Sequence, residues 1–241
     1  TYIKNLESAI VRTKLEYVKN IIKRNVYPSF QKLHKFLIEE YFKIKQELNP
    51  SQTQLIAVSK TKPVEDLQKL YDAGQRDFGE NYVQEGVEKI QQLAKLRPWL
   101  EWHFIGPLQS NKTRDIAEHF DWVHSIDRLK IAERLSSQRG EFPSLGDLQL
   151  CIQVNVSEED SKSGVPLGEA QALCNAISKL PNVVLRGLMA IPAPNTDPVL
   201  QRHAFAAVRD CFIGILAANA SERGYQFFDT LSMGMSDDLE A

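Results

Sequence analysis

Short apolar runs alternate with amphipathic stretches along most of this chain. The clearest run is Leu55–Val58, which is continuous and carries β-branched side chains at Ile56 and Val58. A run of this kind is typical of a strand that is buried on both faces in a parallel sheet. Pro63 and the helical spacing after it end the strand. The pattern therefore predicts a β-strand followed by an α-helix.

The same alternation recurs through the rest of the chain. It predicts further strands over residues 77–81, 101–106, 122–127, 148–156, 183–191 and 227–232. It predicts helices over residues 64–73, 82–96, 167–180 and 199–223, one that begins at Pro107, and one that ends near residue 138. Ahead of the first strand, the apolar spacing predicts two helices, over residues 3–25 and 30–48.

Seven strands that alternate with helices indicate a parallel α/β fold. The spacing leaves room for a crossover helix between parallel neighbours. An open doubly wound sheet and a closed (β/α)8 barrel both fit this pattern. The chain has neither a glycine-rich dinucleotide fingerprint nor a GxxxxGK[ST] phosphate loop, which weakens the nucleotide-binding sheet as an interpretation.

Polar residues and glycine follow the predicted strand ends: Lys60, Asn81, Gly106, Asp127, Asn155 and Ser232. In a barrel this edge of the sheet carries the functional site. We therefore expect an α/β fold of the (β/α)8 TIM-barrel type. Because only the start of a helix follows the seventh strand before Ala241, we expect the barrel to lack its eighth strand. We divide the chain into a helical segment, residues 1–54, and a barrel, residues 55–241.

Composition places the chain among ordinary globular proteins, with 43% hydrophobic and 25% charged residues. The three cysteines, Cys151, Cys174 and Cys211, form no CxxC pair and have no close histidine partner, which argues against a disulfide framework and a zinc site. No apolar run is long enough to span a bilayer, and the N-terminus has no signal pattern. We expect a cytoplasmic protein, a monomer, without a membrane partner.

Charge is distributed unevenly. Residues 1–54 carry ten Lys or Arg and five Asp or Glu, whereas the whole chain has a net charge of −2. A basic amphipathic segment could contact nucleic acid or an anionic membrane. The cations alternate with glutamates and form no cluster with aromatic residues, so we interpret the segment as a solvated helix face and expect no nucleic-acid partner.

Lys60 stands at the end of the first buried strand. A lysine in this position loses water on several sides, which favours the neutral amine that can attack an aldehyde and hold it as a Schiff base. The alternative is that Lys60 only extends its ammonium group from the core into water.

The stretch Ser232-Met233-Gly234-Met235-Ser236 is the second candidate. A predicted strand runs into a glycine turn, and Ser236 occupies an N-cap position before Asp237-Asp238. Free backbone amides at such a turn bind anions, and a barrel holds phosphate after its last strands. An ordinary capped helix would explain the same residues.

Two further residues are candidates at predicted strands. Asn81 could hydrogen-bond a ligand or only stabilise its own turn. His103 lies between aromatic residues on the third strand, where it could contact a ligand ring, although a lone histidine there is more often part of the core. An amine and an anion-binding turn at the same edge suit a ligand that has an aldehyde and a phosphate, as pyridoxal 5'-phosphate (PLP) has.

Seven motifs carry a family resemblance: AVSKTKP, FGENYVQEGVEKI, WHFIGPLQSNKTR, HSIDRLKIAERL, QVNVSEEDSKSGV, LRGLMAIPAP and DTLSMGMSDDLEA. From about residue 55 to 241 the chain resembles the pyridoxal phosphate homeostasis proteins, single-domain relatives of the alanine racemase barrel. The resemblance implies that Lys60 bears PLP, that residues 232–236 bind its phosphate, and that Asn81 and His103 lie in the cofactor pocket.

The resemblance implies a carrier without a reaction of its own, which serves intracellular PLP (vitamin B6) homeostasis and delivers PLP to PLP-dependent apoenzymes. Racemisation or decarboxylation would need a second acid–base group opposite the lysine and a sealed site. The alternative is a small fold-type III enzyme, an amino-acid racemase or decarboxylase. An adaptor that binds nucleic acid or membrane through residues 1–54 is a third possibility, and it predicts salt-dependent binding.

Overall fold

The fold is a curved parallel sheet surrounded by helices. The computed structural model describes residues 11–12, 39, 41–46, 48, 53–157, 163–192 and 197–235. The strands are β1 Val11–Arg12, β2 Leu55–Val58, β3 Asp77–Glu80, β4 Glu101–Phe104, β5 Trp122–Ile126, β6 Leu148–Asn155, β7 Val165–Pro166, β8 Val183–Met189 and β9 Thr230–Ser232. The α-helices are α3 Val64–Asp72, α4 Val83–Gln92, α5 Thr113–His119, α6 Leu129–Arg139, α7 Leu167–Ile177 and α8 Pro198–Asn219.

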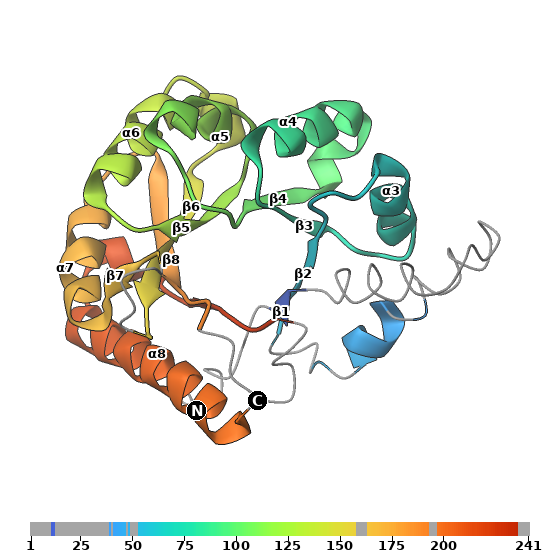
Figure 1. The fold of residues 1–241 in the computed structure, drawn as a ribbon. Coiled ribbons are helices and arrows are strands. Elements are labelled where there is room, and N and C mark those ends of the chain that lie inside the picture. Colours follow the sequence, from blue (N-terminus) through green and yellow to red (C-terminus); the bar gives the residue numbers. More distant parts are fainter. Residues whose placement is uncertain are drawn as a thin grey trace.

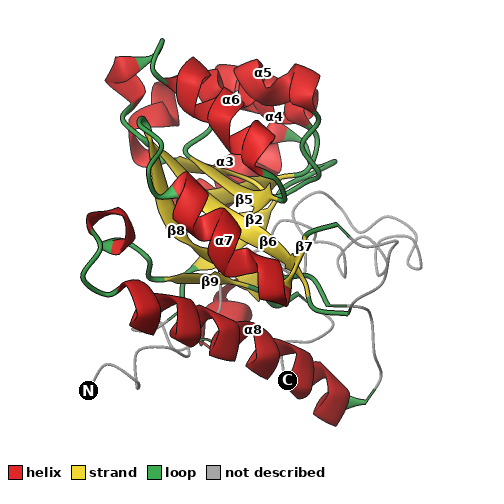
Figure 2. Cartoon of the chain, turned by 90° about the vertical axis from the view of Figure 1, so that its left-hand side faces the viewer, coloured by secondary structure: helices red, strands yellow, loops and turns green. Residues whose placement is uncertain are grey.

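All strand pairs in the described sheet are parallel, and apart from β7 the strands that neighbour each other in the sheet follow each other in sequence. The order is β1-β2-β3-β4-β5-β6-β8-β9, and β7 pairs with β6. The helices cover the outer face of this curved sheet (Figure 1). Helices α7 and α8 pack outside β6 and β8 (Figure 2). The strands and the outer helices form the (β/α) barrel arrangement that the sequence predicts, and each of the seven predicted strands is present.

Alternating side chains divide the buried residues into two groups. Leu55, Phe78 and Trp102 belong to the large core between the sheet and the helices, where Leu67 and Ile116 meet them. A smaller cluster of Trp122, Cys151 and Met189 is separate from that core and lies on the opposite, interior face of the sheet. Strands that are buried on both faces explain the continuous apolar runs.

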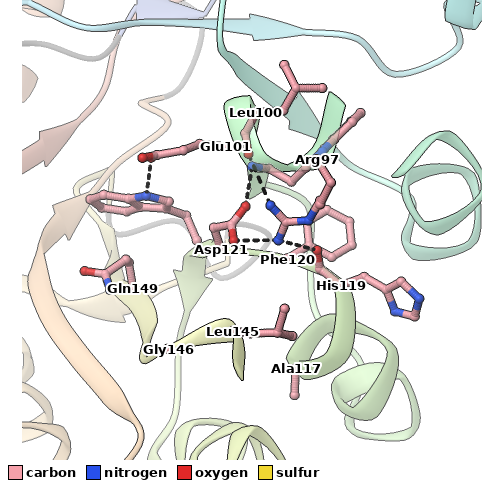
Figure 3. Close-up of polar contacts among 12 residues, drawn as sticks. Arg97, Leu100, Glu101, Ala117, His119, Phe120, Asp121, Leu145, Gly146 and Gln149 are labelled. Atoms are coloured by element: carbon pink, nitrogen blue, oxygen red, sulfur yellow. Dashed lines mark hydrogen bonds and ion pairs between the residues drawn. The ribbon is translucent and has the colours of Figure 1, made fainter. Parts of the chain in front are cut away.

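The edge at the amino ends of the strands is held by polar contacts. Asp121 accepts hydrogen bonds from Arg97 Nη2 at 2.6 Å and from the Trp102 amide at 2.9 Å (Figure 3). The Trp122 indole donates to Glu101 Oε2 at 3.0 Å. In barrels this edge serves stability, so the functional site is expected at the other edge.

Arg139 joins three segments of that edge. Its guanidinium donates to four carbonyl oxygens, those of Ala117, Phe120, Leu145 and Gly146, at 2.7 to 2.9 Å. Burial lowers the pKa of Arg139 from its ordinary value. A planar group with five donors suits this cluster of carbonyls, which explains why an arginine lies almost wholly inside the protein.

The structure corrects two predictions and adds one strand. Val11–Arg12 is a strand that pairs with β2. The predicted helix over residues 3–25 is therefore wrong at these two residues, because pairing with the open edge of β2 outweighs the helical spacing of the apolar side chains. The helix expected at Pro107 begins instead as a 3-10 turn at Ser110–Lys112, because Gln109 is extended. Strand β7 was not predicted, because two residues give too short a pattern.

The remaining N-terminal predictions are only partly covered by the structure. Glu39 and Tyr41–Gln46 are helical, which agrees with the second predicted helix, while most of residues 1–52 lie outside the described residues. Among the residues that the structure describes, no helix has the length and apolarity needed to cross a membrane.

Candidate functional site

Lys60 lies just beyond the carboxyl end of β2. The Ser59 amide continues the ladder by donating to the Gly79 carbonyl at 2.9 Å. Side chains alternate along a strand, so Ile56 and Val58 face away from Leu55 and Ala57, which belong to the core under the helices. A Cβ atom on Gly79 would lie 3.0 Å from Ile56 Cγ2, so the glycine in β3 leaves room for the Ile56 side chain. Lys60 itself is half-buried.

The chain turns sharply after Lys60. The Lys62 amide donates to the Ser59 carbonyl at 3.0 Å, which closes a four-residue turn with Lys60 and Thr61 at its centre. Thr61 has a φ of +60°, a conformation that β-branched residues rarely adopt. Strained backbone of this kind persists only where surrounding contacts hold it, and it is common at ligand sites.

Three side chains of the FGENYVQEGVEKI segment contact this turn. Glu80 accepts from Ser59 Oγ at 2.6 Å, and Lys89 Nζ donates to the Ser59 carbonyl at 2.6 Å. A Glu85 carboxylate oxygen accepts from the Thr61 amide. Sequence reasoning missed these residues, although the i,i+4 spacing of Glu85 and Lys89 on a predicted helix was a visible signal for their ion pair.

Ser232 ends β9, and residues 233–235 follow it at the same edge of the sheet as Lys60, because all the strands are parallel. Gly234 has a φ of +90°, so the turn requires a conformation that glycine adopts without strain. Ser232 is buried, and Met233, Gly234 and Met235 are half-buried. Ser236, the fifth residue proposed for the anion site, lies outside the described residues.

Asn81 also lies at this edge, directly after β3. Its Oδ1 atom is buried and has no hydrogen-bond partner among the described residues. Gly106, after β4, packs against the Asn81 backbone so closely that a Cβ atom would lie 2.2 Å from the Asn81 carbonyl oxygen. A buried acceptor without a donor is costly, so Asn81 is suited to receive a hydrogen bond from a ligand.

His103 does not reach the open edge. Its side chain is 1% exposed and lies inside the barrel, stacked on Trp122. Its Nε2 atom is 3.3 Å from Asp77 Oδ1 and its Nδ1 atom is 3.0 Å from His124 Nε2. His124 Nδ1 is in turn 2.7 Å from Ser232 Oγ. The structure therefore places His103 within a buried chain that ends at the glycine turn.

His124, to which sequence reasoning assigned no role, connects His103 to Ser232. A lone histidine in an apolar strand gives no indication of its partner, because Ser232 is 108 positions away. The alternation of Trp122 and His124 on one strand face was the available signal. Among the predicted site residues, Lys60, Asn81 and residues 232–235 share the carboxyl edge, whereas His103 lies deeper.

Comparison with known proteins agrees with this fold. The sequence profile described as "Alanine racemase, N-terminal domain" matches residues 37–241. An alanine racemase from Corynebacterium glutamicum is 16% identical with a TM-score of 0.62, covering 78% of this chain and 52% of its own, a likeness of fold alone. The fold and the profile define the class of alanine racemase-like barrels.

Closer relatives are more informative. Pyridoxal phosphate homeostasis proteins are 53% identical over 189 residues in Pasteurella multocida, covering 78% of each chain, and 53% identical over 195 residues in Escherichia coli K12, covering 80% of each. Structures of PipY from Synechococcus elongatus without and with PLP bound are 38% identical, cover 85% of this chain and 91% of theirs, and have TM-scores of 0.77 and 0.74. The chain belongs to the pyridoxal phosphate homeostasis protein family.

Proposed function

We propose that this protein binds PLP as a Schiff base on Lys60 and acts in intracellular PLP homeostasis and delivery. The observation that carries the proposal is that Lys60 and the Gly234 turn lie at the same edge of one parallel sheet, in a chain whose relative PipY has been solved with PLP bound. The resemblance of the motifs around both elements to those of the family supports the same assignment.

The residues present fit this cofactor. Lys60 offers an amine, the turn at Gly234 offers backbone amides to an anion, and the unpaired Asn81 Oδ1 offers an acceptor to a ligand donor. When bound, PLP supplies an aldehyde: Lys60 Nζ forms a bond to its carbon, and the aldehyde oxygen leaves as water. Residues 232–236 hold the phosphate while Lys60 holds the ring end.

We propose a carrier rather than an enzyme. The curated relatives are named homeostasis proteins. The two histidines nearest the turn are engaged with each other, with Asp77 and with Ser232, so neither offers a free nitrogen for proton transfer to a ligand. Delivery to PLP-dependent apoenzymes, a cytoplasmic location and a monomeric state belong to the same proposal.

Borohydride reduction with peptide mapping tests the attachment. Reduction of PLP-loaded protein is expected to place the adduct on Lys60, and Lys60→Ala is expected to abolish it. Lys62→Ala is the matched control, because it removes the lysine nearest to Lys60 in the sequence and should leave the adduct in place. A full adduct on Lys60→Ala would overturn the proposal.

Proton exchange separates the carrier from an enzyme. Loaded protein is incubated with single amino acids in deuterated water, and loss of the α-proton is followed by NMR. The carrier predicts exchange no faster than free PLP gives at the same concentration. Exchange at turnover rates typical of enzymes, about 1 per second or more, would instead support a racemase.

A further inference from the structure

A buried ionic network lies behind the proposed cofactor lysine. Lys89 Nζ is 2.8 Å from Glu80 Oε1 and 2.7 Å from Glu85 Oε1. The side chains of Lys89 and Glu80 are 6% and 0% exposed, and that of Glu85 is 27% exposed. Burying such charges is costly unless they are paired, so removing one member of the network is expected to disturb the others.

The network contacts the backbone on both sides of Lys60. Before it, the Ser59 carbonyl accepts a hydrogen bond from Lys89 Nζ at 2.6 Å. After it, the Thr61 amide donates to Glu85. Both contacts come from α4, which follows the neighbouring strand β3. The two peptide groups that flank Lys60 are therefore held by one helix.

These contacts also hold the strained residue. Thr61, with its φ of +60°, needs external support to keep this conformation. Its amide hydrogen bond to Glu85 supplies that support directly, and the bond from Lys89 to Ser59 fixes the residue where the turn begins. Without them, the turn would relax toward ordinary dihedral angles, and the origin of the Lys60 side chain would move.

We propose that Glu85 and Lys89 are positioning residues for Lys60: they hold the Ser59–Lys62 turn so that the amine points at the aldehyde of bound PLP. This inference rests on the proposed function, since it takes Lys60 as the PLP lysine. A role in stability alone does not account for the contact between Glu85 and the Thr61 amide. Lys89 already has a buried carboxylate partner in Glu80, so its charge would be paired even if Glu85 did not reach the backbone of Thr61.

The test compares two ligands that differ in one group. PLP can bond to Lys60, whereas pyridoxine 5'-phosphate has the same ring and phosphate but no aldehyde. Glu85→Ala removes the acceptor for the Thr61 amide, and Glu88→Ala is the matched control, because Glu88 lies exposed on the same helix. We expect Glu85→Ala to weaken PLP binding about five- to tenfold and pyridoxine 5'-phosphate binding less than twofold.

Two further variants and one cofactor-free measurement sharpen the test. Glu85→Gln keeps an acceptor and is expected to restore most of the PLP affinity. Lys89→Met, compared with the exposed Lys95→Met, is expected to show the same selective loss. Hydrogen exchange of the Thr61 amide in the protein without cofactor is expected to be faster in Glu85→Ala than in Glu88→Ala.

The outcomes separate this inference from the proposed function. Equal weakening of both ligands by Glu85→Ala, or no more weakening than Glu88→Ala gives, would overturn the positioning role while Lys60 still carried the borohydride adduct. A borohydride adduct that persists on Lys60→Ala would overturn the proposed function itself. Selective loss of PLP affinity together with faster Thr61 exchange supports the inference.

Discussion

Gly234 is the residue on which the proposed anion-binding turn depends. Its φ of +90° lies where a residue with a branched Cβ is strongly disfavoured. We predict that Gly234→Val weakens binding of PLP and of pyridoxine 5'-phosphate alike, about tenfold, because roughly 1–2 kcal/mol of backbone strain enters the turn. Equilibrium titration of both ligands measures this.

The control for Gly234 is a glycine under the same constraint at the other edge of the sheet. Gly146 has a φ of +67° and precedes β6, so Gly146→Val introduces similar strain far from the turn. It should lower stability and leave both dissociation constants unchanged. Unchanged affinity in Gly234→Val would remove the turn from the anion site.

Glu80 gives a prediction for pH. Burial raises the pKa of Glu80 above its ordinary value, against the opposing effects of Lys89 and Ser59. The folded state therefore keeps this proton to higher pH than the unfolded state, so its contribution to the free energy of unfolding is full below about 4.5 and is lost as pH rises through the folded pKa.

The measurement is denaturant unfolding from pH 4 to 8 of the wild type and Glu80→Gln. We predict that the stability of the wild type relative to Glu80→Gln falls as the pH rises above about 4.5. Glu88→Gln, at an exposed position of α4, is the control for loss of a carboxylate on the protein surface. A relative stability that rises with pH would mean that the ion pair with Lys89 outweighs burial.

At the scale of elements, Arg139 connects α5, α6 and the loop before β6. Four carbonyl oxygens depend on its guanidinium. Lysine has three donors at one point and cannot reach all four, so we predict that Arg139→Lys lowers the free energy of unfolding by about 2–4 kcal/mol. Chemical denaturation measures this change.

Arg134→Lys is the matched control for Arg139, because Arg134 is exposed on the same helix α6 and should change stability by less than about 0.5 kcal/mol. The carboxyl edge of the sheet should be unaffected, so Arg139→Lys should bind PLP with the affinity of the wild type. A cost below that of Arg134→Lys would show that water replaces the lost hydrogen bonds.

Helix α4 shows how one element serves two purposes. Its apolar side chains Val83, Val87 and Ile90 belong to the core, and its periodicity predicted it from the sequence. Between these side chains, Glu85 and Lys89 point at the turn after β2. Helical spacing predicts which face of α4 is buried, but the identity of the backbone it meets depends on the packing of β2 beside β3.

At the scale of the whole molecule, the reactivity of the cysteines measures how often the barrel opens. Cys151 and Cys174 are fully buried, and burial raises the pKa of both thiols, that of Cys174 to about 12. Cys211 is half-buried, and burial raises its pKa as well. Because the thiolate is the reactive form, we predict that a thiol reagent modifies Cys211 first and reaches the other two only through opening of the barrel.

Bound cofactor provides the check. If Cys151 and Cys174 react only in the unfolded state, PLP at 100 times its dissociation constant should slow their labelling about 100-fold. Denatured protein should label at all three positions at similar rates. Labelling of Cys151 that is insensitive to PLP would indicate a local opening near β6.

The sequence predicted the positions of the strands better than the side-chain contacts inside the barrel. All seven strands were found because short runs with buried apolar or aromatic side chains recur between helical stretches, whereas Val11–Arg12 and Val165–Pro166 are too short to give a pattern and depend on a partner strand. His103 was placed in the cofactor pocket on the strength of its motif. Its buried contacts with Asp77 and His124 depend on strand register, which periodicity does not specify.

The amino-acid sequence alone determined the alternation of strands and helices, the lysine at the end of β2 and the glycine that permits the turn after β9. These features are local, because they depend on side-chain size, β-branching and backbone freedom within a few residues. Only the tertiary structure decided which side chains face the interior, that Glu85 and Lys89 hold the turn at Lys60, and that His124 reaches Ser232. Those contacts join residues far apart in the chain, and they exist only once parallel strands have brought their ends to a common edge.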